Sequence, residues 1–251
     1  MTRVRSQLVA VILTLASACA TPHGIEVPYA AAEERDRIAS LLSLALVDLT
    51  FQPPDASPRR GHNIAAIMVD DRSQRIIDYG LNCNHLFHSP IQHAETRLIG
   101  KTIRRLNAEG KKGHYRALLA GCTIYTTLEP CSMCAGMMDL ANLPRVVFAQ
   151  ADPSQRSISH LLHELHPDSS PRPSQIDLDL ARELDREFAA TQLSITDFLR
   201  TPEAHMMFTE AGRRLRGFEC RFPENEPFLD QARRFLDSPP AAVEPAEGEH
   251  R

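Results

Sequence analysis

The sequence predicts an α/β protein, a three-layer α/β/α sandwich around a mixed sheet. Two observations support this prediction. Residues 63–79 hold two apolar strand patterns around an Asp-rich turn, which indicates a β-hairpin and therefore an antiparallel pair. Residues 122–149 hold two strand patterns around a helix pattern, and such a unit makes a right-handed crossover between parallel strands. A hairpin and a crossover that share one sheet make that sheet mixed.

The first part of the chain alternates helix and strand patterns. Apolar residues at helical spacing before residue 50 predict a helix, and three prolines at 53, 54 and 58 then predict a loop. The expected elements are a helix over 27–49, strands over 63–69 and 75–79, a helix over 93–107, a strand over 122–128, a helix over 131–143 and a strand over 145–149.

After Asp152 the helix pattern dominates. We expect helices over 157–165, 178–191, 195–215 with an interruption near Pro202, and 227–236, and a Pro/Ser loop over 167–174. The chain thus divides into an α/β domain over 27–153, a helical extension over 154–237 and a Pro, Ala and Glu-rich tail over 238–251 that is predicted to be disordered. Packing on the sheet is the expected role of the extension, with a lid or a subunit contact as alternatives.

Residues 1–20 have the pattern of an export signal. Arg3 and Arg5 precede an apolar run, Leu8–Leu15, that is too short to span a bilayer, and Ala18-Cys19-Ala20 fits a cleavage site with small residues. Residues Leu15–Cys19 also resemble a bacterial lipobox, which predicts a lipid anchor at Cys19. The expected location is therefore exported, either periplasmic or membrane-anchored as a lipoprotein, and the alternative is a cytoplasmic protein with an ordinary apolar N-terminal helix.

Charge and composition argue against a broadly basic nucleic-acid-binding surface. The net charge is −4 at pH 7 and the pI is about 6.3. Basic stretches over 101–116 and 213–221 are interpreted as solvated helix faces. Since the chain has no Trp and only 6% aromatic residues, any base-stacking platform would be small.

Two short motifs point to the chemistry of a metal site. His93-Ala94-Glu95 and Pro130-Cys131-Ser132-Met133-Cys134 supply three zinc ligands and one carboxylate that is not a ligand. Cys131 and Cys134 are three residues apart and share a helix face, and Pro130 fits the opening of that helix. Three protein ligands leave a fourth position for water, so zinc hydroxide is the expected nucleophile and Glu95 the expected proton shuttle. The alternative is a closed zinc site or two cysteines that are simply buried.

H-x-E followed by P-C-x-x-C is the signature of zinc nucleobase deaminases. The stretches Thr126–Gly136 and Arg145–Phe148 resemble the bacterial tRNA-specific adenosine deaminase branch of the cytidine deaminase-like superfamily, and the resemblance covers roughly residues 29–152. It implies a cytidine deaminase-like fold, a zinc deaminase domain over 27–153, and a homodimer whose partner loops help to form the pocket. The residues to which it assigns roles are His93, Cys131 and Cys134 as Zn²⁺ ligands, Glu95 as proton shuttle, and Asn82, His88 and Glu129 as substrate-binding residues. The backbone N–H of Glu129 or of Cys131 is expected to hold the zinc-bound water or the base.

The preferred hypothesis is therefore a zinc-dependent hydrolase of a C–N bond in a cyclic amidine. The motif resemblance favours adenine in tRNA, in another nucleic acid or in a nucleoside, converted from adenosine to inosine. The predicted export signal and the acidic charge favour a free base of the guanine or cytosine type instead. A catalytically silent zinc-binding partner module is an alternative of another class, which the presence of Glu95 disfavours, and an exported deaminase toxin is a third hypothesis.

Overall fold

A five-stranded mixed sheet lies at the centre of the protein. The computed structural model describes residues 29–110 and 117–241. The strand order is β2-β1-β3-β4-β5. β1 (Ala65–Asp70) pairs antiparallel with β2 (Arg75–Leu81) and with β3 (Cys122–Leu128). β3 pairs parallel with β4 (Arg145–Gln150), and β4 pairs parallel with β5 (Arg172–Gln175).

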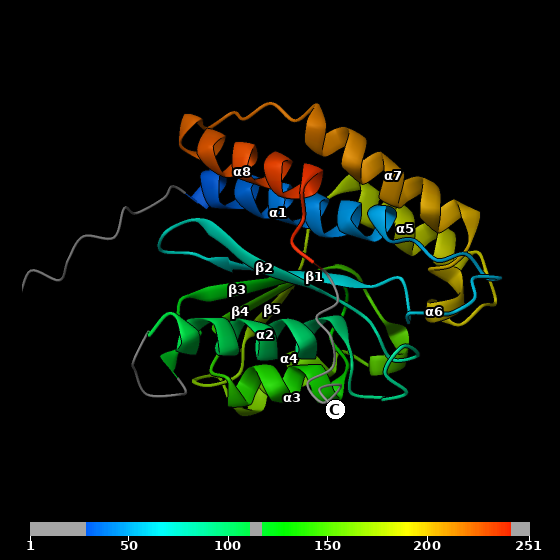
Figure 1. Ribbon diagram of the computed structural model, residues 1–251, viewed down its shortest axis with the longest axis horizontal. Helices are drawn as coiled ribbons and strands as arrows, with labels where there is room; N and C mark the ends of the chain where they lie inside the picture. Colours follow the sequence, from blue (N-terminus) through cyan, green and yellow to red (C-terminus); the bar gives the residue numbers. More distant parts are fainter. Residues whose placement is uncertain (1–28, 111–116, 242–251) are drawn as a thin grey trace, which may run out of the picture.

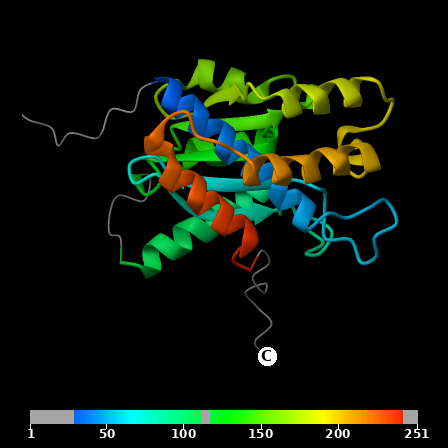
Figure 2. The ribbon, with the colours of Figure 1, turned by 90° about the horizontal axis from the view of Figure 1, so that it is seen from above.

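Helices cover both faces of this sheet, which confirms the predicted three-layer sandwich (Figure 1). One face carries α1 (Tyr29–Leu49), α5 (Asp179–Ala189), α7 (Pro202–Arg216) and α8 (Glu226–Asp237), and the other carries α2 (Ala94–Ala108), α3 (Ser132–Leu140) and α4 (Ile158–Leu165). A single turn, α6 (Ile195–Phe198), connects α5 to α7. α1 crosses β1, β3 and β4, and α7 and α8 pack alongside it (Figure 2).

The predicted loop over 167–174 is confirmed for residues 167–171 and wrong for its last three residues, because residues 172–175 form the edge strand β5. Its sequence, Arg-Pro-Ser-Gln, has no alternating apolar pattern, and Pro173 lacks the N–H of an ordinary strand residue. An edge strand tolerates proline since one side of its backbone has no ladder to complete. The extension over 154–237 is therefore not wholly helical, and it completes the sheet of the preceding domain.

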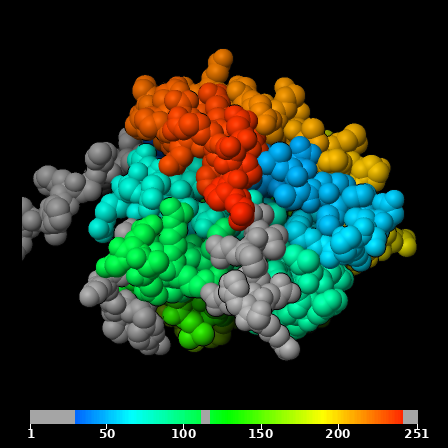
Figure 3. All heavy atoms as spheres, in the orientation of Figure 1, coloured from blue at the N-terminus to red at the C-terminus, as the bar shows by residue number. Residues whose placement is uncertain are grey.

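The first residues of the predicted disordered tail are ordered. The backbone oxygen of Pro240 accepts a hydrogen bond from the Tyr79 hydroxyl at 2.9 Å, and that of Ala241 accepts one from Lys101 Nζ at 3.4 Å. Figure 3 shows the end of α8 and the residues after it lying over the middle of the viewed face. The rest of the tail, the predicted export signal and Cys19 lie outside the described residues. Within residues 29–110 and 117–241, no helix is both long and apolar enough to cross a bilayer.

A buried polar cluster joins α1 to the sheet. Asp36 of α1 accepts hydrogen bonds from the two terminal guanidinium nitrogens, Nη1 and Nη2, of Arg145 on β4, at 2.8 and 2.6 Å. The same carboxylate accepts a hydrogen bond from the Tyr125 hydroxyl of β3 at 2.7 Å. Asp36 and Tyr125 are both buried. Because a bidentate arginine pair demands one geometry, this cluster sets how α1 crosses the sheet.

We expect Asp36→Ala to lower the free energy of unfolding by about 3 kcal/mol, since it leaves a largely buried guanidinium and a phenol hydroxyl without their acceptor. Urea unfolding followed by circular dichroism measures this loss. Arg182→Ala is the control, because Arg182 pairs with Asp177 and Asp179 on the surface and should leave the unfolding midpoint almost unchanged. Equal midpoints for the Asp36 variant and the wild type would contradict the assigned role of the cluster.

Candidate metal centre and pocket

The sheet topology brings the two motifs together. β2 and β3 are both antiparallel to β1, so they run in the same direction and end at the same edge of the sheet. α2 follows β2 and α3 follows β3, and both helices begin at that edge. His93 is the N-cap of α2 and Cys131 is the N-cap of α3, both in extended conformation, while Glu95 and Cys134 lie in the first turns. The positive ends of two helix dipoles therefore point at the same place.

The three candidate ligands match the donor geometry of tetrahedral zinc. Cys131 Sγ and Cys134 Sγ are 3.6 Å apart, and His93 Nδ1 lies 3.5 Å from the first and 3.4 Å from the second. Zinc bonds of about 2.3 Å to sulfur and 2.0 Å to nitrogen, at tetrahedral angles, place the sulfurs about 3.8 Å apart and each sulfur about 3.5 Å from the nitrogen. Among the described residues no fourth His, Cys, Asp or Glu joins this group. The donor set thus fits an open three-ligand site, as predicted.

The surroundings prepare these groups for metal binding. The hydrogen bond with Cys134 lowers the pKa of the Cys131 thiol to about 4, with a further contribution from His93, so Cys131 is a thiolate at neutral pH. The hydrogen bond with Cys131 and burial raise the pKa of Cys134 well above its usual range. A bound cation favours the thiolate form of both cysteines, because thiolates are the ligands.

Glu95 is buried beside the three candidate ligands. Its Oε1 accepts a hydrogen bond from the Thr126 hydroxyl of β3 at 3.0 Å, and its Oε2 lies 3.5 Å from Cys134 Sγ. Burial raises the pKa of the Glu95 carboxyl, which favours the form that carries a proton. A carboxyl held in this way is suited to taking up and releasing a proton.

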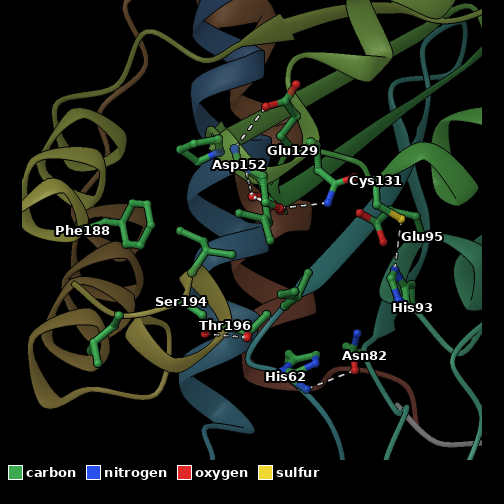
Figure 4. A pocket seen from close by; sticks show the side chains of 17 residues that line it. His62, Asn82, His93, Glu95, Glu129, Cys131, Asp152, Phe188, Ser194 and Thr196 are labelled. Atoms are coloured by element: carbon green, nitrogen blue, oxygen red, sulfur yellow. Dashed lines mark hydrogen bonds between the residues drawn. The ribbon is translucent and has the colours of Figure 1, made fainter. Parts of the chain in front are cut away.

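A pocket of about 460 Å³ opens onto this centre (Figure 4). It is lined by His93, Glu95 and Cys131, and by Asn82 and Glu129 of the residues that the resemblance assigns to substrate binding. The sequence reasoning missed its other described lining residues, which are His62, Ile64, Leu128, Asp152, Pro153, Ser154, Gln155, Phe188, Leu193, Ser194, Ile195 and Thr196. Leu128 ends β3 and Ile64 lies in the expected strand over 63–69, but neither was singled out as a pocket residue. The others lie on loops and on the extension, where neither periodicity nor a motif marks them.

The Asn82 side chain holds the local backbone through its oxygen and also lines the pocket. Its side-chain Oδ1 accepts hydrogen bonds from the backbone N–H groups of His62 at 3.0 Å and Asn84 at 3.3 Å. No described residue accepts a hydrogen bond from its Nδ2, so this nitrogen is available as a donor at the pocket. A Cβ on Gly61 would lie 2.3 Å from Asn82 Oδ1, so only glycine allows this close approach.

Two details of the sequence interpretation need correction. The backbone N–H of Glu129 donates to the Gln150 carbonyl at 2.8 Å and is therefore used by the sheet, because pairing of β3 with β4 continues past Leu128. Its side chain instead accepts hydrogen bonds from the Asp152 N–H at 3.1 Å and the Ser159 hydroxyl at 3.4 Å. His88 does not line the pocket, since it lies exposed on a tight turn with φ 46°.

His62 lines the pocket beside Asn82 (Figure 4). Its Nδ1 is buried and has no hydrogen-bond partner within residues 29–110 and 117–241. Burial lowers the pKa of His62 to about 4, so the imidazole is neutral at physiological pH. A sequence signal for this residue is weak, since a lone His before a strand is common. Only the approach of the 61–64 segment to Asn82 shows that it faces the site.

Gly80 of β2 sets the position of α2. A Cβ at Gly80 would lie 2.2 Å from the Ala94 carbonyl oxygen, so Gly80→Ala must push back the helix turn that carries His93 and Glu95. We expect lower zinc content on purification and a loss of about 1–3 kcal/mol in the free energy of unfolding.

Gly136→Ala is the matched control for Gly80→Ala. It lies inside α3, and nothing is within 4 Å of its added Cβ, so it should retain zinc and gain about 0.5–1 kcal/mol from helix propensity. Metal analysis by mass spectrometry and urea unfolding measure both variants. Full zinc content in Gly80→Ala would show that zinc binding does not depend on the close packing of Gly80 against the first turn of α2.

Comparisons with known proteins match the same region. Residues 51–150 match the family model of the cytidine and deoxycytidylate deaminase zinc-binding region. A tRNA-specific adenosine deaminase of Haemophilus influenzae is 32% identical over 40% of this chain and 53% of its own length. That of Bacillus subtilis is 43% identical over 36% of this chain and 50% of its own. A probable cytosine deaminase of Schizosaccharomyces pombe is 32% identical over 35% and 46%. The chain thus spans about half the length of these curated relatives.

Solved structures show weaker likenesses. A structure from work on A-to-I editing by tRNA:A34 deaminases is 22% identical, with a TM-score of 0.37, over 55% of this chain and 86% of that one. A guanine deaminase from Nitrosomonas europaea is 19% identical, with a TM-score of 0.35, over 74% and 94%. The family match and the three converging ligands agree with each other. Residues 51–150 of this chain match the zinc-binding region of cytidine and deoxycytidylate deaminases, and the three candidate zinc ligands lie within that match.

Proposed function

We propose that this chain is a zinc-dependent hydrolytic deaminase of a nucleobase. The observation that carries the proposal is the open three-ligand set beside a buried carboxyl, both on the wall of one pocket. His93, Cys131 and Cys134 hold the zinc in this proposal. When bound, zinc supplies the Lewis acidity that makes a water nucleophilic near neutral pH.

The residues of the chain then manage protons and position the base. Glu95 takes one proton from the attacking water and passes it to a ring nitrogen. It then takes the second proton from the hydroxyl that has added to the base and gives it to the departing amine. Water adds to the amidine carbon and ammonia leaves, so a C–NH₂ group becomes a carbonyl. Asn82 Nδ2 donates a hydrogen bond to the base. Glu129 holds the 152–155 segment at the pocket wall through the Asp152 N–H.

Adenine is the base that most of the named relatives favour, because their names specify tRNA-specific adenosine deamination. The substrate is then adenine in tRNA, in another nucleic acid or in a nucleoside. A free base of the guanine or cytosine type is the second candidate, supported by the relative named as a probable cytosine deaminase. A silent zinc module fits poorly, because Glu95 lines the pocket beside the ligands. A homodimer, the export signal over residues 1–20 and the lipid anchor at Cys19 stay predictions, with a cytoplasmic enzyme as the alternative.

Glu95→Gln removes the proton shuttle and keeps the size of the side chain. We expect ammonia release to fall by at least about a hundredfold, while zinc content stays at that of the wild type. The assay uses free bases, nucleosides, tRNA and single-stranded DNA, with adenine, guanine and cytosine represented. Thr102→Ser is the control, because Thr102 is as buried as Glu95 but lies seven residues further along α2 and does not line the pocket. This variant should keep activity. Undiminished release in Glu95→Gln would remove this residue from the mechanism.

Zinc should also contribute to stability. Cys131→Ser is expected to lower zinc content to a small fraction of the wild type and to shift unfolding to lower urea, because a ligand that binds only the folded state stabilises it. Cys220→Ser is the matched control, since this half-buried cysteine lies on the segment between α7 and α8. Wild-type zinc content in the Cys131 variant would exclude this thiolate as a ligand.

A further inference from the structure

The extension builds the end of the pocket that lies opposite the metal centre. Phe188 of α5 and Leu193–Thr196 at the start of α6 line the same cavity as His93 and Glu95. Figure 4 shows Phe188, Ser194 and Thr196 across the pocket from His93. Residues beyond the segment that matches the family model, 51–150, therefore line the cavity into which the metal ligands face. We call Phe188 and Leu193–Thr196 the extension wall.

Hydrogen bonds on both sides hold the extension wall in place. Ser194 caps α6 by accepting from the Asp197 N–H at 3.2 Å. Just after α6, the Leu199 carbonyl accepts a hydrogen bond at 3.0 Å from the Nδ2 of Asn63, the residue that follows His62 in the chain. Arg200 Nη2 then donates to the carbonyls of Pro53 and Pro54 at 2.7 and 2.6 Å. These hydrogen bonds join the extension wall to the loop that precedes β1. They therefore fix the position of the wall relative to the rest of the pocket.

The lining of the pocket is acidic or neutral. Glu95, Glu129 and Asp152 are buried carboxyls, and none of the described lining residues is Lys or Arg. Proteins that bind nucleotides or polynucleotides neutralise phosphates with Lys, Arg or backbone N–H groups. Away from the zinc ligands, a phosphate in this pocket would lie beside the Glu129 and Asp152 carboxyls, and like charges brought together cost several kcal/mol.

The polar groups that remain suit an uncharged ligand. His62 lines the pocket, and its buried Nδ1 finds no partner in the part of the chain that the structure describes. An unpaired buried polar atom costs about 1–3 kcal/mol. Asn82 offers its Nδ2 nearby. On the extension wall, Ser194 and Thr196 present hydroxyl groups beside the apolar Phe188 and Leu193. Neutral donors and acceptors next to apolar surface match a base edge and a sugar.

We propose that this pocket takes a substrate without phosphate, a free nucleobase or a nucleoside, and rejects nucleotides and polynucleotides. The base edge lies toward His62 and Asn82, and the sugar or other neutral substituent lies against the extension wall. The proposal rests on the proposed deaminase function and selects among its substrates. It makes the extension a determinant of specificity in addition to a packing layer.

The first test compares four forms of the base that the ammonia assay identifies: free base, nucleoside, 5′-monophosphate and a short single-stranded oligonucleotide. We expect kcat/KM for the free base or the nucleoside to exceed that for the monophosphate and the oligonucleotide by at least about tenfold. Activity should not fall as salt rises from about 50 to 200 mM, whereas a polynucleotide substrate would lose affinity steeply over this range. A preferred monophosphate or oligonucleotide would overturn the proposal and leave the deaminase standing.

Calorimetric binding to the Glu95→Gln protein separates the two proposals. Adenosine and guanosine are titrated against their monophosphates, so that recognition is measured without turnover. Binding of a nucleoside but not of its monophosphate supports the substrate class even if ammonia release proves absent. Tighter binding of a monophosphate overturns it, whatever the activity.

Leu193→Lys tests the extension wall directly. Leu193 is 46% exposed, and a lysine there would offer a cation to a phosphate, so the preference for nucleoside over monophosphate should shrink about fivefold or more. Leu161→Lys is the matched control, since Leu161 is 48% exposed on α4 and does not line the pocket. An unchanged preference in Leu193→Lys, with the fold intact by circular dichroism, would show that the wall does not meet the substituent.

Discussion

The common direction of β2 and β3 is the constraint on which the rest of this structure depends. Since both strands pair antiparallel with β1, the helices that follow them begin at one edge of the sheet. His93 and Cys131 occupy the N-caps of these helices, and their donor atoms meet within 3.5 Å. Two helix N-termini then favour the thiolate ligands at the same point. A change in strand order would separate the motifs, whatever their sequences.

Two glycines allow close backbone packing at this end of the sheet and so fix the positions of the site residues. Gly80 lets α2 lie against β2, and Gly61 lets the segment before β1 lie against Asn82. The Asn82 side chain in turn accepts a hydrogen bond from the His62 N–H, so these contacts position both the α2 turn that carries His93 and the segment that carries His62. The buried cluster of Asp36, Tyr125 and Arg145 acts on the other face, where it holds α1 across the strands. α7 and α8 then pack on α1 rather than standing apart from the sheet.

The extension over 154–237 is not a separate domain, because it has two structural roles in the α/β domain. It supplies β5, α5, α7 and α8 to the central sandwich, and it supplies the wall of the pocket opposite the metal centre. The metal ligands and Glu95 lie within the segment that matches the family model, whereas the extension wall lies outside it. Chemistry and selectivity therefore come from different parts of the chain in the function proposed here. This arrangement lets one reaction centre serve different substrates as the surrounding wall changes.

The sequence by itself determined the layer architecture, nearly every helix and strand, and the set His93, Glu95, Cys131 and Cys134, because periodicity and ligand spacing are local properties. It missed β5, whose pairing with β4 comes from tertiary contact and not from an apolar pattern. It placed His88 in a pocket that this residue does not line, and it assigned to the Glu129 N–H a role that the sheet excludes. Only the tertiary structure brought His62 and Leu193–Thr196 to the pocket, because residues more than 100 positions apart meet there through packing that no local pattern records.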